Sequence, residues 1–225
     1  MHSPHPTPPS APSPAASART GALFAVLSLV LLILVAISWA PLLSADESLA
    51  DPLHRWAVAE PGLTEVNRVL SDWVWDPWTM RLLIAAAAVW LWVLRERLLA
   101  VWIVATSALG TAMQQGLKAA VGRERPQWPD PVDSAHYAAY PSGHAMTATV
   151  TCGLLLWLLR RHGASGALWW TCAAVAVVSV AGVGFTRLYL GVHWPSDVVG
   201  GWLLGACVVA LSIAGYTRLH LSRRL

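Results

Sequence analysis

Long, nearly uninterrupted apolar runs follow one another along the chain. The first extends from Ala22 to Leu43, and the others cover residues 79–94, 98–117, 143–159, 167–185 and 198–217. Each is near the roughly 20 residues that a helix needs to cross about 30 Å of hydrocarbon. Because a backbone in lipid must satisfy its own hydrogen bonds, we expect every run to be helical. The pattern predicts an all-α integral membrane bundle of six transmembrane helices, in which the second run is short and has Arg81 near its start.

The two ends of the chain differ in composition from the apolar part. Residues 1–20 are rich in Pro, Ser and Ala and bury too little apolar surface to fold, so we expect a disordered cytoplasmic tail. Residues 218–225 form a short basic cytoplasmic tail, which leaves 21–217 as the membrane domain. The first run is longer than the roughly 7–15 residues of a signal-peptide core, and no small-residue cleavage site follows it. We therefore interpret it as a retained span.

Basic residues are grouped in alternate connecting segments. They lie between the second and third runs, between the fourth and fifth, and after the sixth, at Arg95, Arg97, Arg160, Arg161, Arg218, Arg223 and Arg224. By the positive-inside rule these segments and both termini are cytoplasmic, in a plasma (inner) membrane. The first outer segment, 45–78, is acidic and contains Trp56, Trp73, Trp75 and Trp78, which predicts a helix lying along the membrane interface.

The composition agrees with a membrane protein and disfavours other classes. Hydrophobic residues make up 56% of the 225 and charged residues only 12%, with a mean hydropathy of +0.53. Soluble domains have roughly 25% charged residues. The net charge is only +3, with basic residues in small groups, which disfavours a nucleic-acid-binding surface. Cys152, Cys172 and Cys207 lie inside apolar runs and are interpreted as small core residues.

Polar residues of chemical interest concentrate in the other two outer segments, 118–142 and 186–197, or just beside them. Three patterns occur in order, namely Lys118 with Arg125-Pro126, then Pro141-Ser142-Gly143-His144, then Arg187 with His193 and Asp197. Together they resemble the three signature motifs of the type-2 phosphatidic acid phosphatase superfamily, which also includes vanadium haloperoxidases and glucose-6-phosphatase. The resemblance covers about residues 45–217. One departure is Thr186, where the family usually has Ser before the arginine.

Three cations stand where the positive-inside rule disfavours them. Lys118 and Arg125 are seven residues apart, although Arg125 precedes Pro126 and is expected outside regular helix. Arg187 adds a guanidinium suited to bidentate contact with phosphate oxygens. The alternative, that these side chains snorkel to the interface, fits their location poorly. We therefore expect Lys118, Arg125 and Arg187 to bind phosphate.

The start of the fourth run has the features of an anion site. Ser142 stands at a helix N-cap position, and Gly143 allows close approach of a ligand to the backbone. Exposed N–H groups and the positive end of the helix dipole favour an anion there. An ordinary capped helix start would explain Ser142 and Gly143 alone, but His144 in the first turn favours a functional site.

His193 and Asp197 are four residues apart around Pro195, which fits the first turn of the sixth helix. Asp197 can accept the Nδ1 proton of His193 and thereby leave Nε2 free to attack phosphorus. Taken alone, His193 could be an ordinary histidine at the membrane interface. The presence of Asp197 and Arg187 nearby in the sequence disfavours that interpretation. The family resemblance implies that His193 is the nucleophile, Asp197 its orienting carboxylate and His144 the general acid.

The same resemblance implies that Lys118, Arg125, Ser142, Gly143 and Arg187 hold the phosphoryl oxygens and that no metal or other cofactor is required. Asp130, Asp133 and His136 are conceivable metal ligands, but a solvated loop is favoured. His2, His5, His54, His162 and His220 have no comparable neighbours in sequence.

The sequence thus predicts a membrane phosphatase that acts on a lipid phosphate or diphosphate at the extracytoplasmic face. Undecaprenyl diphosphate is the first choice of substrate, and phosphatidic acid and phosphatidylglycerol phosphate are the alternatives. The rival of another class is a protein that binds or transports a phosphorylated lipid without cleaving it. Such a protein needs the cations but has little use for two histidines and a paired carboxylate.

Overall fold

The computed structural model describes residue 7 and residues 13–222, and within them all regular structure is helical. The elements in chain order are α1 (Pro14–Ala36), α2 (Ala40–Ala59), α3 (Pro61–Val69), the π-helical segment η1 (Leu70–Val74), α4 (Pro77–Val93), α5 (Arg97–Val121), α6 (Gly143–Arg161), α7 (Gly166–Tyr189) and α8 (Pro195–Ser222). The predicted all-α class is therefore confirmed.

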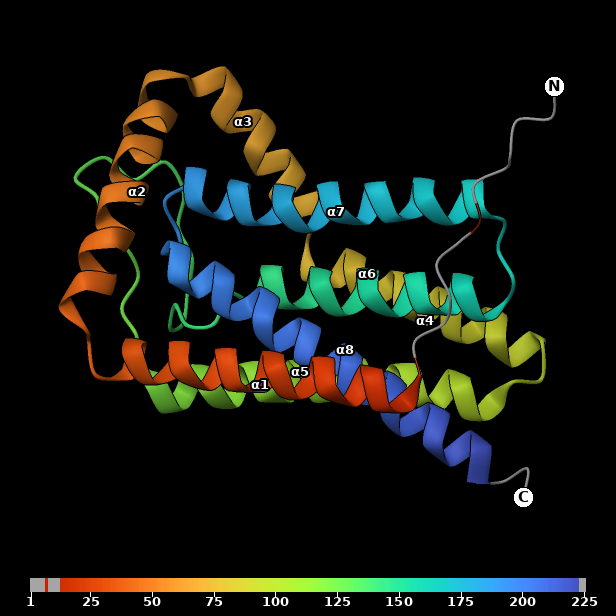
Figure 1. Cartoon of the computed structure of the whole chain (residues 1–225). Helices are drawn as coiled ribbons and strands as arrows, with labels where there is room; N and C mark the ends of the chain where they lie inside the picture. The colour runs from red at the N-terminus through yellow and green to blue at the C-terminus, as the bar shows by residue number, and fades with distance from the viewer. Residues whose placement is uncertain (1–6, 8–12, 223–225) are drawn as a thin grey trace, which may run out of the picture.

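The long helices form a bundle, and α2 and α3 cover one of its ends. Helices α1, α5, α6 and α7 have nearly parallel axes, with α6 opposite to the others in chain direction, and α8 passes obliquely between α1 and α6 (Figure 1). Helix α2 stands across one end of this bundle, and α3 continues from it toward α7. Helix α1 begins, and α8 ends, at the opposite end.

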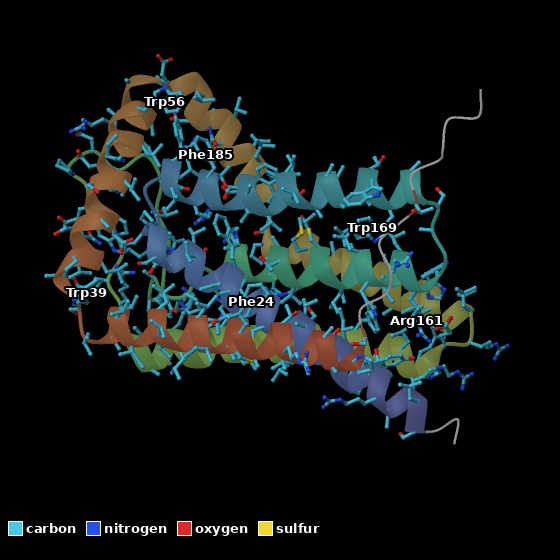
Figure 2. All side chains as sticks on the ribbon, in the orientation of Figure 1. Phe24, Trp39, Trp56, Arg161, Trp169 and Phe185 are labelled. Carbon is cyan, nitrogen blue, oxygen red and sulfur yellow. The ribbon has the colours of Figure 1, made fainter. Side chains whose placement is uncertain are left out.

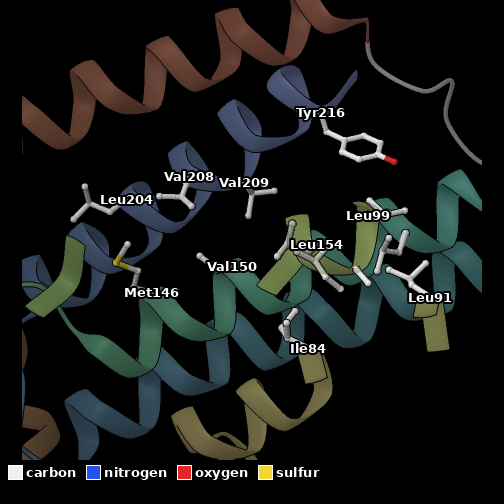
Figure 3. Close-up of a cluster of buried hydrophobic side chains, with 13 residues drawn as sticks. Ile84, Leu91, Leu99, Met146, Val150, Leu154, Leu204, Val208, Val209 and Tyr216 are labelled. Carbon is white, nitrogen blue, oxygen red and sulfur yellow. The ribbon is translucent and has the colours of Figure 1, made fainter. Parts of the chain in front are cut away.

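Helix α6 is central to the packing, because it contacts α4, α5, α7 and α8. The main apolar cluster is built from α4, α5, α6 and α8, with Leu91, Leu99, Ile103, Met146 and Leu154 at most 1% exposed (Figure 3). Side chains such as these interlock tightly, and tight packing holds helices together where lipid removes the hydrophobic drive between them.

Two glycines let α8 approach α6 closely. A Cβ on Gly201 would lie 2.7 Å from the carbonyl oxygen of Ser142, and one on Gly205 would lie 2.8 Å from Cβ of Thr149. Small residues at helix contacts are typical of membrane bundles. This close contact sets the start of α8 directly against the start of α6.

In the part of the chain that the structure describes, four helices are long and apolar enough to cross a membrane, namely α1, α5, α7 and α8. Helices α4 and α6 correspond to the second and fourth predicted spans, but α4 has only 17 residues and α6 carries a polar side in its first turns. The count of six spans accordingly stays a prediction.

The first predicted span, Ala22 to Leu43, has the wrong boundaries. Helix α1 ends at Ala36, Ser38 adopts a positive φ of 51°, and α2 starts at Ala40 with a proline in its first turn. Residues 14–20, which we expected to be disordered, belong to α1. Residues 1–6, 8–12 and 223–225 of the two predicted tails lie outside the described residues, while 218–222 belong to α8.

The first outer segment is more structured than one interfacial helix. It contains α2, α3 and η1, and Trp56 lies at the far end of α2 from the α1–α2 elbow, where Trp39 is found (Figure 2). Trp56, Trp73 and Trp78 are 47%, 74% and 72% exposed. Exposed indole rings on an acidic segment agree with an interfacial location, which stays a prediction.

Candidate active site

The three polar patterns meet at one end of the bundle. Lys118 lies in the last turn of α5 and Arg187 in the last turn of α7, while Gly143 begins α6 and Pro195 begins α8. The irregular segment 122–142 joins α5 to α6 at this end, which is also the end that α2 covers (Figure 1). Four helix ends, the segment 122–142 and the short segment between α7 and α8 thus supply the predicted site residues.

His193 lies in the short segment between α7 and α8 and is 2% exposed. Its Nδ1 is 3.3 Å from Oδ2 of Asp197, which is fully buried in the first turn of α8. The same carboxylate oxygen accepts a hydrogen bond of 2.9 Å from the backbone N–H of Trp194. The carboxylate is therefore fixed by the turn that carries the imidazole.

The other ring nitrogen of His193 faces a cation. Nη1 of Arg125 lies 3.1 Å from Nε2 of His193. A guanidinium N–H can only donate, so Nε2 is the acceptor and the ring proton is on Nδ1, directed at Asp197. These two contacts select the tautomer that exposes the Nε2 lone pair.

Arg125 lies after the end of α5, as the sequence predicted, and backbone carbonyls hold its guanidinium. Nε donates to the carbonyl of Tyr137 at 2.9 Å, Nη1 to that of Val192 at 2.5 Å and Nη2 to that of His136 at 3.1 Å. Its orientation is thus set by two separate segments of backbone.

The other two predicted phosphate-binding cations are buried. Lys118 is 7% exposed, and its Nζ donates to the backbone carbonyls of Ala138 and Ala139. Arg187 is 4% exposed, and its Nη1 donates to Oγ of Ser71 at 2.7 Å. Its Nε has no hydrogen-bond partner among the described residues, so this donor is free for a ligand.

Ser142 occupies the N-cap position of α6 as predicted, but its side chain makes no capping hydrogen bond. The buried Oγ of Ser142 has no partner within the described part of the chain. Its backbone N–H donates to the carbonyl of Asp197 at 2.9 Å, which joins the start of α6 to that of α8. The hydroxyl is therefore available to a ligand.

Gly143 and His144 form the first turn of α6. A Cβ at Gly143 would lie 2.5 Å from the side-chain nitrogen of the buried Gln114, so a larger residue here requires the Gln114 amide to move. Nε2 of His144 is 4.0 Å from Oδ2 of Asp76, and the imidazole is within electrostatic range of His193 and Arg187. His144 thus faces the same cluster.

Burial lowers the pKa of His193 well below its ordinary value of 6.5. Nearby positive charges lower the pKa further, in the order Arg125, Arg187, Lys118 and Arg123. Both effects disfavour the protonated ring. His193 is consequently a neutral imidazole at physiological pH, the form that can act as a nucleophile.

Thr186, the departure from the family pattern, is 1% exposed and donates from Oγ1 to the carbonyl of Val183 at 3.0 Å. Its hydroxyl is thus used within α7. This contact agrees with a packing role for the residue.

Two residues of this end were not expected to belong to the site. Arg123 donates from Nη1 to Oδ1 of Asp197 at 2.7 Å and from Nη2 to Oδ2 of Asp46 at 2.6 Å. In the sequence, Asp46 contributed only to the acidic balance of the first outer segment. Arg123, two residues before Arg125, was the available signal, since it is a further cation beside the first motif.

The conceivable metal ligands Asp130, Asp133 and His136 do not form a site. Within residues 7 and 13–222, no group of three or more His, Cys, Asp or Glu side chains is arranged to hold a metal ion. The carbonyl of His136 instead accepts from Arg125.

Comparison with known proteins agrees with this arrangement. The sequence model of the PAP2 superfamily matches residues 98–220. An undecaprenyl-diphosphatase of Sulfolobus acidocaldarius is 30% identical over 151 residues, which cover 63% of this chain and 63% of that protein. A phosphatidylglycerophosphatase B of Bacillus subtilis is 33% identical over 93 residues, which cover 40% of this chain and 44% of that protein. The chain thus spans less than two thirds of the length of either relative.

A solved structure has the same fold. The crystal structure of a transmembrane PAP2-type phosphatidylglycerolphosphate phosphatase from Bacillus subtilis superimposes with a TM-score of 0.78, covering 88% of this chain and 96% of that one at 24% identity. The helical bundle with three polar motifs at one end therefore has the fold of the PAP2-type phosphatases. The chain belongs to the PAP2 superfamily.

Proposed function

We propose that this protein hydrolyses a phosphorylated lipid through a phosphohistidine formed on His193. The single observation that carries the proposal is the pair of contacts on that imidazole, with Nδ1 at Asp197 and Nε2 at Arg125. An acceptor on one nitrogen and an anion-binding cation beside the other hold a neutral nucleophile next to a phosphate site.

The first step forms a bond between Nε2 of His193 and phosphorus. The bond from phosphorus to the leaving oxygen breaks, its electron pair stays on that oxygen, and His144 donates the proton. Asp197 stabilises the positive charge that the imidazole ring acquires. In the second step His144 removes a proton from water, the water oxygen attacks phosphorus, and inorganic phosphate leaves while His193 regains its lone pair.

The proposed phosphate ligands are Lys118, Arg125, Arg187, Ser142 and Gly143. Charge in the transition state spreads over the phosphoryl oxygens, so fixed donors around them supply the main stabilisation. The unpartnered Ser142 Oγ and Arg187 Nε support this assignment, since buried donors are seldom left unused. The cations provide the positive charge that a metal ion supplies elsewhere, and the proposed reaction needs no metal or cofactor.

Undecaprenyl diphosphate is the proposed substrate, and the Sulfolobus relative favours it. The Bacillus relative favours phosphatidylglycerol phosphate as the second candidate. A cavity of about 550 Å³ beside the site offers room for the part of the lipid next to the phosphate. Its lining combines apolar Val35, Ala36 and Leu43 with charged residues of both signs, and an amphiphile fits such a mixed surface. The charged residues are Asp46, Glu47, Arg123, Glu124 and Arg125.

The proposed location is the plasma membrane with the site outside and both termini inside. Arg95, Arg97 and Arg161 lie at the bundle end opposite to the site, where Arg161 is labelled in Figure 2, and the positive-inside rule assigns that end to the cytoplasm.

A phosphate-release panel tests the proposal. Purified protein is given undecaprenyl diphosphate, phosphatidic acid and phosphatidylglycerol phosphate in one detergent, with and without EDTA and with vanadate. We expect release that persists in EDTA, stops with vanadate and is lost in His193→Ala while lipid binding remains. A protein that binds these lipids and releases phosphate from none of them is a binder or transporter, and the proposal is then wrong.

A further inference from the structure

A buried polar group lies behind the His193–Asp197 pair, on the side away from the ring. It consists of Asp46, Arg123, Ser196 and Asp197, and we call it the Asp46 network. Asp46 Oδ1 accepts from the backbone N–H of Ser196 at 2.8 Å, and its Oδ2 accepts from Oγ of Ser196 and Nη2 of Arg123, both at 2.6 Å. Nη1 of Arg123 donates to Oγ of Ser196 at 2.6 Å and to Oδ1 of Asp197 at 2.7 Å.

The network uses the carboxylate oxygen that His193 does not use. Oδ2 of Asp197 serves the imidazole and the Trp194 N–H, while Oδ1 is held by Arg123. Rotation of the carboxylate would break the contact to Arg123. Arg123 is fixed in turn by Asp46, so the position of the Asp197 carboxylate depends on a residue of α2.

The charges of the network suit a ring that becomes positive. Two carboxylates share one guanidinium, and the side chains of Asp46, Arg123 and Asp197 are only 3%, 10% and 0% exposed. A buried excess of negative charge is unfavourable unless a cation approaches it. The imidazole provides that cation when Nε2 bonds to phosphorus.

We propose that Asp46 and Arg123 are positioning residues, which hold Asp197 in the orientation that keeps the Nδ1 proton of His193 in place. The inference rests on the proposed function. Asp46 lies outside residues 98–220, so α2 adds a buried partner to a site whose proposed catalytic and phosphate-binding residues all belong to the matched family region. A purely structural link between α2 and α8 would also hold the helices together, but it would not affect the imidazole.

The test compares Asp46→Asn, Arg123→Gln and Arg123→Lys with the parent in the full-length protein. Asp51→Asn is the matched control, because Asp51 is on the same helix and pairs with Arg55 in an exposed ion pair. We expect the first three variants to lose about 10- to 100-fold in kcat, by analogy with the loss of hydrogen-bond partners that orient metal-binding histidines and carboxylates. KM should change by less than about threefold, since substrate contacts remain.

The pH profile of kcat/KM supplies a readout that a structural role would not move. The charged and titratable groups around His193 are Arg125, Arg187, Lys118, Arg123, Asp197 and His144. Removing the positive charge in Arg123→Gln should move the acid limb to higher pH. Removing the negative charge in Asp46→Asn should move it to lower pH, and Arg123→Lys should leave it in place.

Reduced kcat in Arg123→Lys with the acid limb in place, together with opposite movements of the acid limb in Arg123→Gln and Asp46→Asn, supports the positioning role. Parent-like kcat and pH profiles in Asp46→Asn and Arg123→Lys overturn it. If Asp46→Asn does not fold, Arg123→Lys decides alone, with reduced kcat supporting the role and full kcat refuting it. A parent that releases no phosphate refutes the proposed function instead, so the two failures are distinguishable.

Discussion

Replacing Asp197 by asparagine tests the proposed mechanism at its most constrained atom pair. In the parent, both carboxylate oxygens act only as acceptors, with His193 Nδ1 and the Trp194 N–H at Oδ2 and Arg123 at Oδ1. An amide has one acceptor oxygen and one donor nitrogen of nearly the same shape. The amide side chain of the Asp197→Asn variant therefore cannot satisfy both sides.

Each orientation of the amide has a definite cost. With its oxygen toward Arg123, its NH₂ group faces the Trp194 N–H and forces Nδ1 of His193 to accept. The ring proton then moves to Nε2, where it opposes the N–H of Arg125 at 3.1 Å and removes the attacking lone pair. With its oxygen toward His193, the NH₂ group faces Arg123 in a site that is fully buried.

The expected loss in kcat is about 10³- to 10⁴-fold, by analogy with the same substitution behind a catalytic histidine in serine proteases. That loss corresponds to about 4–5.5 kcal/mol of transition-state stabilisation. Phosphate release is measured at saturating lipid, with lipid affinity measured separately. Asp130→Asn, an exposed position in the loop 122–142, is the control and should retain full turnover. A folded Asp197→Asn protein within tenfold of the parent kcat, taking about 1.4 kcal/mol per tenfold change, would refute the assigned role.

Because the pKa of His193 is lowered, the proposed nucleophile should stay neutral as the pH falls through 6.5. The acid limb of kcat/KM that reports protonation of His193 should therefore lie below pH 6.5, and an acid limb centred at or above pH 6.5 would contradict the assignment. Gly143→Ala places a Cβ 2.5 Å from the end of the buried Gln114 side chain and should cost about 1–3 kcal/mol of stability in a thermal melt. Gly110→Ala, whose nearest contact is at 3.5 Å, should melt like the parent, and equal melts of the two variants would show that Gln114 moves aside without cost. Ala36→Trp fills part of the cavity beside the site and should raise KM several-fold for a long-chain lipid phosphate but not for a short-chain one. Ala105, which lines a separate cavity, provides the control, and Ala105→Trp should leave both KM values unchanged. An equal effect of Ala36→Trp on the two substrates would exclude binding of the lipid chain in the cavity beside the site.

The sequence predicted those parts of the fold and site that depend on neighbouring residues. Apolar runs located the long helices, and short motifs placed Lys118, Arg125, His144, Arg187 and His193 at their ends. These are local signals, because helix length and motif spacing are both read within a few tens of residues. In the structure, the helix ends that carry the three motifs lie together at one end of the bundle.

The elbow after α1 could not be read from hydropathy. The residues on both sides of Ser38 are apolar, so the run continues to Leu43 although the helix ends at Ala36. The break depends on the positive φ of Ser38 and on Pro41 at the start of α2, which are backbone features rather than changes in polarity.

The Asp46 network was invisible for a different reason. Arg123 and Asp46 are 77 residues apart, and their contact exists only because α2 folds back over the start of α8. Likewise, α6 is less apolar than a lone span because its first turns face the site and other helices rather than lipid. Contacts between residues far apart in the sequence therefore determine the Asp46 network and the polar side of α6, and patterns within one stretch of sequence do not predict such contacts.

The proposed transfer of phosphate to His193 can be detected by mass spectrometry of alkali-quenched enzyme. During turnover of a lipid phosphate, we expect one added phosphate on the peptide that contains His193, absent from the His193→Ala variant and increased in amount when hydrolysis is slowed. Continued phosphate release with no phosphate on any histidine of the chain would refute the phosphohistidine, because water would then attack the lipid phosphate directly.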